Sequence, residues 1–119
     1  MNLSKWRGSA LSRALFWAAF CFAFVMAVMP HPPDIPGNPS DKLQHITAFA
    51  TLGLLGSFAF PSTPIILLLL RLSMFGALIE VVQAIPFLHR DSDVFDWIAD
   101  TGALCVVLAF VWWCRRVRH

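Results

Sequence analysis

Four long apolar segments alternate with short polar stretches along this chain. They cover residues 11–29, 41–60, 65–86 and 94–114, and the eight prolines lie between these segments or at their ends. A helix that crosses a membrane needs roughly 20 residues, and proline does least harm at helix ends because it has no backbone N–H to donate. The pattern therefore predicts an all-α membrane protein with four transmembrane helices in a compact bundle, forming a single domain over residues 1–119.

The composition supports this class. Hydrophobic residues make up 58% of the chain and charged residues only 13%, whereas a soluble domain usually carries about 25% charged residues. The mean hydropathy is +0.69. We therefore expect a membrane-embedded protein with no nucleic-acid partner, and the sequence leaves open whether it forms a homo-oligomer.

Basic residues indicate how the bundle is oriented. Six of the nine lysines and arginines lie before the first apolar segment, at its start, or after the last segment: Lys5, Arg7, Arg13, Arg115, Arg116 and Arg118. Because positively charged flanks stay on the cytoplasmic side, we expect both termini to be cytoplasmic. The connections Pro30–Ser40 and Phe87–Asp93 would then face outward. The basic start and apolar run resemble a signal peptide, but MAVMP is a poor cleavage site, so we expect a retained first helix.

In this orientation all seven acidic residues fall in the outer half: Asp34, Asp41, Glu80, Asp91, Asp93, Asp96 and Asp100. Helical spacing pairs Asp41 with His45, Glu80 with Gln83, and Asp96 with Asp100, each pair on one helix face. Glu80 and Asp100 lie roughly 9 Å below the outer helix ends, at about 1.5 Å per residue. An ionised carboxyl at such depth avoids lipid. We therefore expect these faces to meet in one outward-facing polar pocket.

These residues resemble the signature of a known family. Asp41-Lys42-x-x-His45, Glu80-x-x-Gln83, Arg90 and Asp96-x-x-x-Asp100 follow one another in this order within residues 40–103. The set is similar to that of the VanZ-like family, small multi-helix membrane proteins named for a protein linked to low-level teicoplanin resistance. Asp100 stands where the family often has Asn, and Gly102 comes one position early. The resemblance implies a multi-pass protein of the bacterial inner membrane with a role in glycopeptide or envelope-stress tolerance, but it supplies no mechanism.

Three functions fit the predicted pocket. The first is binding or processing of a membrane lipid or lipid-linked envelope precursor, with eight ligand-binding residues: Asp41, Lys42, His45, Glu80, Gln83, Arg90, Asp96 and Asp100. The second is enzymatic, with Glu80, Asp100 or His45 as the catalytic general acid or base. The third is a structural or assembly subunit in which the buried polar network only fixes helix packing.

The nature of any cofactor stays open at this point. A divalent cation could be held by the imidazole and carboxylate groups of four residues: His45, Glu80, Asp96 and Asp100.

Some of the polar residues at the helix starts have a simpler explanation. Serine and aspartate are common helix N-caps, and this role suits Ser40 and Asp41 as well as Asp91, Ser92 and Asp93.

The remaining small side chains are predicted to serve packing. We expect the three cysteines, Cys21, Cys105 and Cys114, to be free thiols that pack within the helices. The small residues Gly53, Gly56, Ser57, Gly76, Ala77, Gly102 and Ala103 are expected at close helix–helix contacts.

Overall fold

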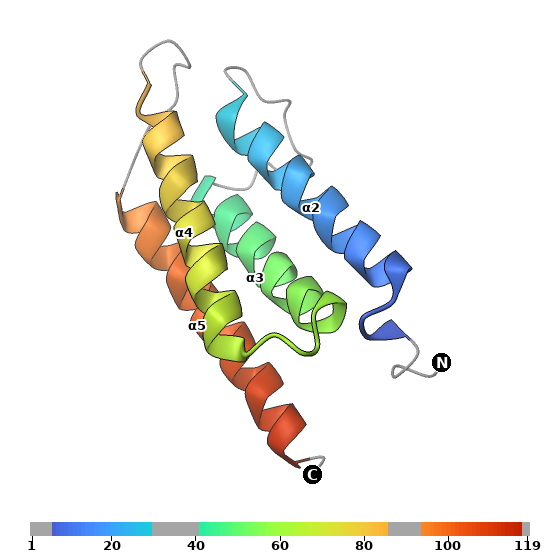
Figure 1. The fold of residues 1–119 in the computed structure, drawn as a ribbon. Helices are drawn as coiled ribbons and strands as arrows, with labels where there is room; N and C mark the ends of the chain where they lie inside the picture. Colours follow the sequence, from blue (N-terminus) through green and yellow to red (C-terminus); the bar gives the residue numbers. More distant parts are fainter. Residues whose placement is uncertain (1–5, 30–40, 86–93, 118–119) are drawn as a thin grey trace.

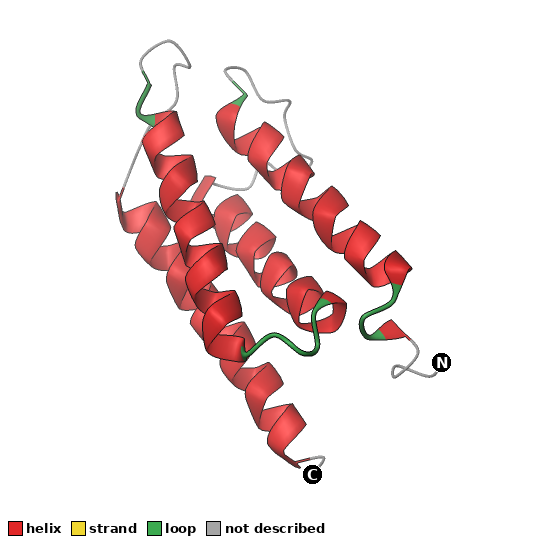
Figure 2. Cartoon of the chain, in the orientation of Figure 1, coloured by secondary structure: helices red, strands yellow, loops and turns green. Residues whose placement is uncertain are grey.

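The computed structural model describes residues 6–29, 41–85 and 94–117. Four long helices make up nearly all of this: α2 (Ala10–Val28), α3 (Asp41–Ala59), α4 (Ile65–Gln83) and α5 (Val94–Val117). They run lengthwise in a bundle that measures 49 × 24 × 24 Å (Figure 1). The described residues contain helices and loops and no strand (Figure 2). The predicted all-α, four-helix bundle is confirmed.

The helix bounds differ by a few residues from the predicted segments, for local reasons. α2 begins after Ser9, whose side chain caps the helix by accepting a hydrogen bond from the Ser12 N–H. α4 ends at Gln83 instead of residue 86, because Ile85 precedes a proline and the residue before proline disfavours the helical conformation. α5 continues to Val117, and two arginines in its last turn favour the helix C-terminus.

The outer surface of the bundle is apolar. α2, α4 and α5 are long and apolar enough to cross a membrane, and Leu43–Ala59 of α3 is a shorter apolar helical stretch. Phe22, Met74 and Val106, on three different helices, are 68%, 72% and 72% exposed. Apolar surface of this extent is unfavourable in water and suits contact with lipid tails. The chain is therefore a membrane protein.

Large apolar side chains fill the space between the helices. The most buried are Phe49 and Leu52 of α3, Ile79 of α4, and Leu104 and Leu108 of α5. The ring of Phe20 on α2 stacks on Phe75 of α4 with centroids 4.0 Å apart. Lipid tails are as apolar as leucine, so helix association in a membrane depends on the fit of such contacts.

Three glycines allow close approach of neighbouring helices, as predicted. A Cβ atom at Gly53 would lie 3.2 Å from Leu104, and one at Gly56 would lie 3.2 Å from Phe16. At Gly76 it would meet Phe49 and Trp97 at 3.3 Å. The prediction is wrong for Gly102, where a Cβ would meet nothing within 4 Å because the position faces away from the other helices.

The cysteines are free, as predicted, but two of them do not pack inside the bundle. Cys21 and Cys105 are exposed and Cys114 is half-buried. Cys105 directly follows the fully buried Leu104, and successive residues of a helix point in different directions. Cys105 therefore lies on the outer surface.

The start of α2 and the end of α5 lie at the same end of the bundle (Figure 1). There, the guanidinium of Arg115 donates a 2.8 Å hydrogen bond to the carbonyl of Ser57, and the Gly8 N–H donates to the carbonyl of Phe58 at 2.7 Å. Both carbonyls belong to the last turn of α3, where no intrahelical donor remains. α3 has no basic residue in its own last turn, so Arg115 supplies a cation to this helix end from α5.

A matched pair of glycine substitutions tests the packing. Gly53→Leu is expected to destabilise the protein by about 1–3 kcal/mol, because the added side chain overpacks the contact with Leu104. Gly102→Leu is expected to leave stability unchanged or to raise it, since leucine favours a helix more than glycine does. Thermal unfolding of both variants in detergent measures this, and an equal loss from both would contradict the described contact.

Candidate functional site

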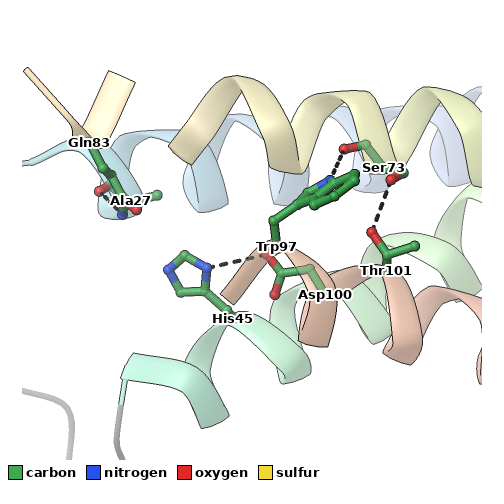
Figure 3. A network of polar contacts seen from close by, with 7 residues as sticks. All are labelled: Ala27, His45, Ser73, Gln83, Trp97, Asp100 and Thr101. Carbon is green, nitrogen blue, oxygen red and sulfur yellow. Dashed lines mark hydrogen bonds and ion pairs between the residues drawn. The ribbon is translucent and has the colours of Figure 1, made fainter. Parts of the chain in front are cut away.

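Three helices bring ionisable side chains together at the end of the bundle opposite to Arg115. His45 lies near the start of α3, Glu80 near the end of α4, and Asp100 near the start of α5. One ligand atom from each residue lies within 4.8 Å of the others. The His45 Nδ1 and Asp100 Oδ2 atoms are 3.4 Å apart (Figure 3). We call His45, Glu80 and Asp100 the triad.

The triad is buried. Asp100 is 1% exposed and Glu80 8%, and the His45 side chain is 10% exposed. The Asp100 Oδ1 atom is buried and has no hydrogen-bond partner among the described residues. Taking carboxylates out of water costs several kcal/mol per ion unless attraction and hydrogen bonds offset the loss. Such a group at a membrane helix end needs an explanation beyond packing.

Polar contacts between α4 and α5 hold Asp100 in place. The Trp97 Nε1–H donates to the Ser73 carbonyl at 2.9 Å, and the hydroxyls of Ser73 and Thr101 share a 2.9 Å hydrogen bond. Figure 3 shows Trp97 and Thr101 on either side of Asp100 along α5, both directed towards α4. These bonds fix the rotation of α5 about its axis. None of these three supporting residues was predicted from the sequence, although a serine and a threonine inside apolar helices are candidates for hydrogen bonds between helices.

Gln83 has a structural contact. Its Nε2 donates a 2.8 Å hydrogen bond to the Ala27 carbonyl, which belongs to the last turn of α2 and has no intrahelical donor. Figure 3 shows this pair apart from His45 and Asp100. Gln83 therefore joins the ends of α2 and α4, a role that the sequence analysis did not foresee.

Of the remaining predicted ligand-binding residues, the structure describes the side chain of Asp96 alone. Asp96 is half-buried one turn before Asp100 and contributes no atom to the group of three. α3 begins at Asp41, but the side chains of Asp41 and Lys42 lie outside the described residues, as does the whole of Arg90. The proposed caps at Ser40, Asp91, Ser92 and Asp93 also lie outside them.

A groove of about 430 Å³ runs between α2 and α3 and reaches the triad. Ala19, Ala23 and Ala27 lie on its α2 side together with Phe22 and Met26, and the small alanine side chains at helical spacing leave room for the groove. Its α3 side includes His45, and Ile79 of α4 contributes to the lining. The volume lies in the range of about 300–1,000 Å³ that is typical of ligand pockets. The sequence analysis did not predict this groove, although the alanine spacing signalled it.

Comparisons of the chain with family models, with curated proteins and with solved structures find no match. The VanZ-like resemblance therefore stays a prediction. The geometry of the triad and the groove is the observation on which a functional proposal can rest.

The Trp97 contact can be tested with a matched tryptophan. Trp97→Phe keeps an aromatic ring but removes the donor to Ser73, so we expect a loss of about 1 kcal/mol in stability. Trp113→Phe makes the same chemical change at a position that is 57% exposed, and it should cost little. The measurement is the denaturation midpoint of each variant. Similar midpoints for Trp97→Phe and Trp113→Phe would show that the Trp97 hydrogen bond does not stabilise α5.

Proposed function

We propose that this protein is a VanZ-like, multi-pass protein of the bacterial inner membrane that binds an envelope lipid or lipid-linked precursor in an outward-facing pocket. One observation carries the proposal: the buried triad adjoins an apolar groove, and His45 belongs to both. An apolar groove that ends at polar side chains fits an amphiphile, with the chain in the groove and the headgroup at the triad.

The charge distribution supports an outward orientation of the pocket. Arg13 and Arg115 bind backbone carbonyls at one end of the bundle, and the triad lies at the other. Because basic residues favour the cytoplasmic side, the triad end would face outward. A pocket on that face meets lipids and lipid-linked precursors of the envelope.

The exposure of the groove supports a ligand that arrives from the membrane. Phe22 on one side and Leu43 on the other are 68% and 52% exposed on the lipid-facing surface. A lipid chain could therefore enter sideways without crossing water. A role in glycopeptide or envelope-stress tolerance would follow from the capture of such a ligand. Processing of the ligand would use His45, Glu80 or Asp100 as general acid or base.

A structural role is the alternative, and specific contacts favour it for part of the network. Gln83 bonds to the end of α2 and Trp97 to the backbone of α4, so both side chains have clear packing functions. This alternative leaves unexplained why the groove lies open beside His45.

Photo-crosslinking tests lipid binding. A photoactivatable polyprenyl-phosphate sugar in phosphatidylcholine vesicles should label peptides of the groove, because its sugar hydroxyls can donate hydrogen bonds to the triad carboxylates, and excess unlabelled probe should compete. Thr51 is exposed and lines the groove, so Thr51→Trp should fill it without disturbing the core. We expect a loss of about tenfold in labelling, equivalent to about 1.4 kcal/mol.

The control is Val106→Trp, which adds the same bulk at an exposed position of α5 outside the groove lining. It should label like the wild type. Uniform labelling of all lipid-facing surfaces, insensitive to Thr51→Trp, would contradict the proposal.

Fusion reporters test the orientation. Green fluorescent protein fused after His119 should fluoresce, and alkaline phosphatase fused there should be inactive, because the positive-inside rule keeps this end in the cytoplasm. Phosphatase fused after a chain truncated at Phe87 should be active. The reverse pattern would place the triad on the cytoplasmic side.

A further inference from the structure

Each residue of the triad lies on a different helix and has a side chain that can bind a metal ion. One imidazole nitrogen and two carboxylate oxygens have ligand atoms within 4.8 Å of one another. These side chains lie 20 or more positions apart in the sequence, so only the bundle brings them to one point. Their convergence in an apolar interior is costly if no cation is present.

The distance between His45 and Asp100 is informative. At 3.4 Å, it exceeds the roughly 2.7–3.2 Å usual for an N–H···O hydrogen bond. Two ligands bound to one tetrahedral zinc ion, each about 2.1 Å from it, stand about 3.4 Å apart. The observed separation, which is that of a long hydrogen bond or ion pair, also matches the separation of two ligands of one ion. One carboxylate oxygen of Glu80 lies within 4.8 Å of a ligand atom of each of the other two residues, so the three side chains can adjust to one ion.

A second observation at Asp100 points to a ligand. Its Oδ1 atom is buried and has no hydrogen-bond partner among the described residues, in a side chain that is 1% exposed. Glu80 and Asp100 place two carboxyl groups beside the His45 imidazole. A divalent cation bound there would provide a partner for the carboxylate oxygens, including Asp100 Oδ1.

We propose that His45, Glu80 and Asp100 bind one divalent transition-metal ion of the zinc type. Imidazole with carboxylates suits such ions better than it suits magnesium or calcium. Three protein ligands would leave a coordination position open, as in catalytic zinc sites, and His45 places the ion beside the groove. Asp96 is not a ligand in this proposal, which narrows the four residues expected from the sequence to three. The inference goes beyond lipid binding and does not depend on it.

The test is metal content of the purified, tag-free protein in detergent. The protein is stripped with a chelator, incubated with Zn²⁺, desalted and analysed by mass spectrometry of the elements. Binding to other histidines and cysteines is subtracted with the triple variant His45→Ala/Glu80→Gln/Asp100→Asn. We expect about one zinc ion per wild-type chain. Asp100→Asn should weaken binding by at least the roughly 100-fold that loss of an outer-shell partner can cost.

Asp91→Asn is the matched control, because it makes the same chemical change at an acidic residue that the proposal does not use. It should retain zinc like the wild type. A wild-type content equal to that of the triple variant, or equal loss from Asp91→Asn and Asp100→Asn, would overturn the proposal.

A second measurement needs no variant that might misfold. Zinc that binds only the folded protein stabilises it, so a chelator should lower the melting temperature of the wild type, and Zn²⁺ but not Mg²⁺ should restore it. No shift with either ion would count against the site. The assays contain no lipid ligand, so a negative metal result leaves the crosslinking test of the lipid pocket unaffected.

Discussion

The carboxyl groups of Glu80 and Asp100 are buried between helices of an apolar bundle, and much of the structure follows from this constraint. Such groups cannot face lipid without a large cost, so α4 and α5 must turn them inward. His45 of α3 then lies within 3.4 Å of Asp100. The contacts among these three side chains therefore constrain how α3, α4 and α5 are rotated about their own axes.

Hydrogen bonds between uncharged groups also hold α4 against both α5 and α2. Trp97 and Thr101 join α5 to Ser73 on α4, while Gln83 joins α4 to the end of α2. These bonds end on backbone carbonyls or hydroxyls, so they add no further charge to the interior. They place Asp100 rigidly, as a ligand-binding group requires.

The two ends of the bundle differ in chemistry. At one end, Arg115 and the Gly8 N–H complete the last turn of α3, which leaves that end closely tied. At the other, the small side chains of α2 leave the groove open beside His45. This difference between the two ends is consistent with the proposed binding of a lipid at the end that holds the triad.

The sequence by itself determined the class, the four helices and the residues that had to avoid lipid, because hydropathy, proline positions and helical spacing are local properties. It also predicted that Glu80, Asp100 and His45 would converge. It could not separate Asp96 and Gln83 from that group, since all of them share helix faces with triad residues and only the packing angles between helices decide which atoms meet. The groove, the hydrogen bonds of Trp97 and the outward position of Gly102 were likewise decided by tertiary structure, because each depends on how far apart two helices lie at one height of the bundle.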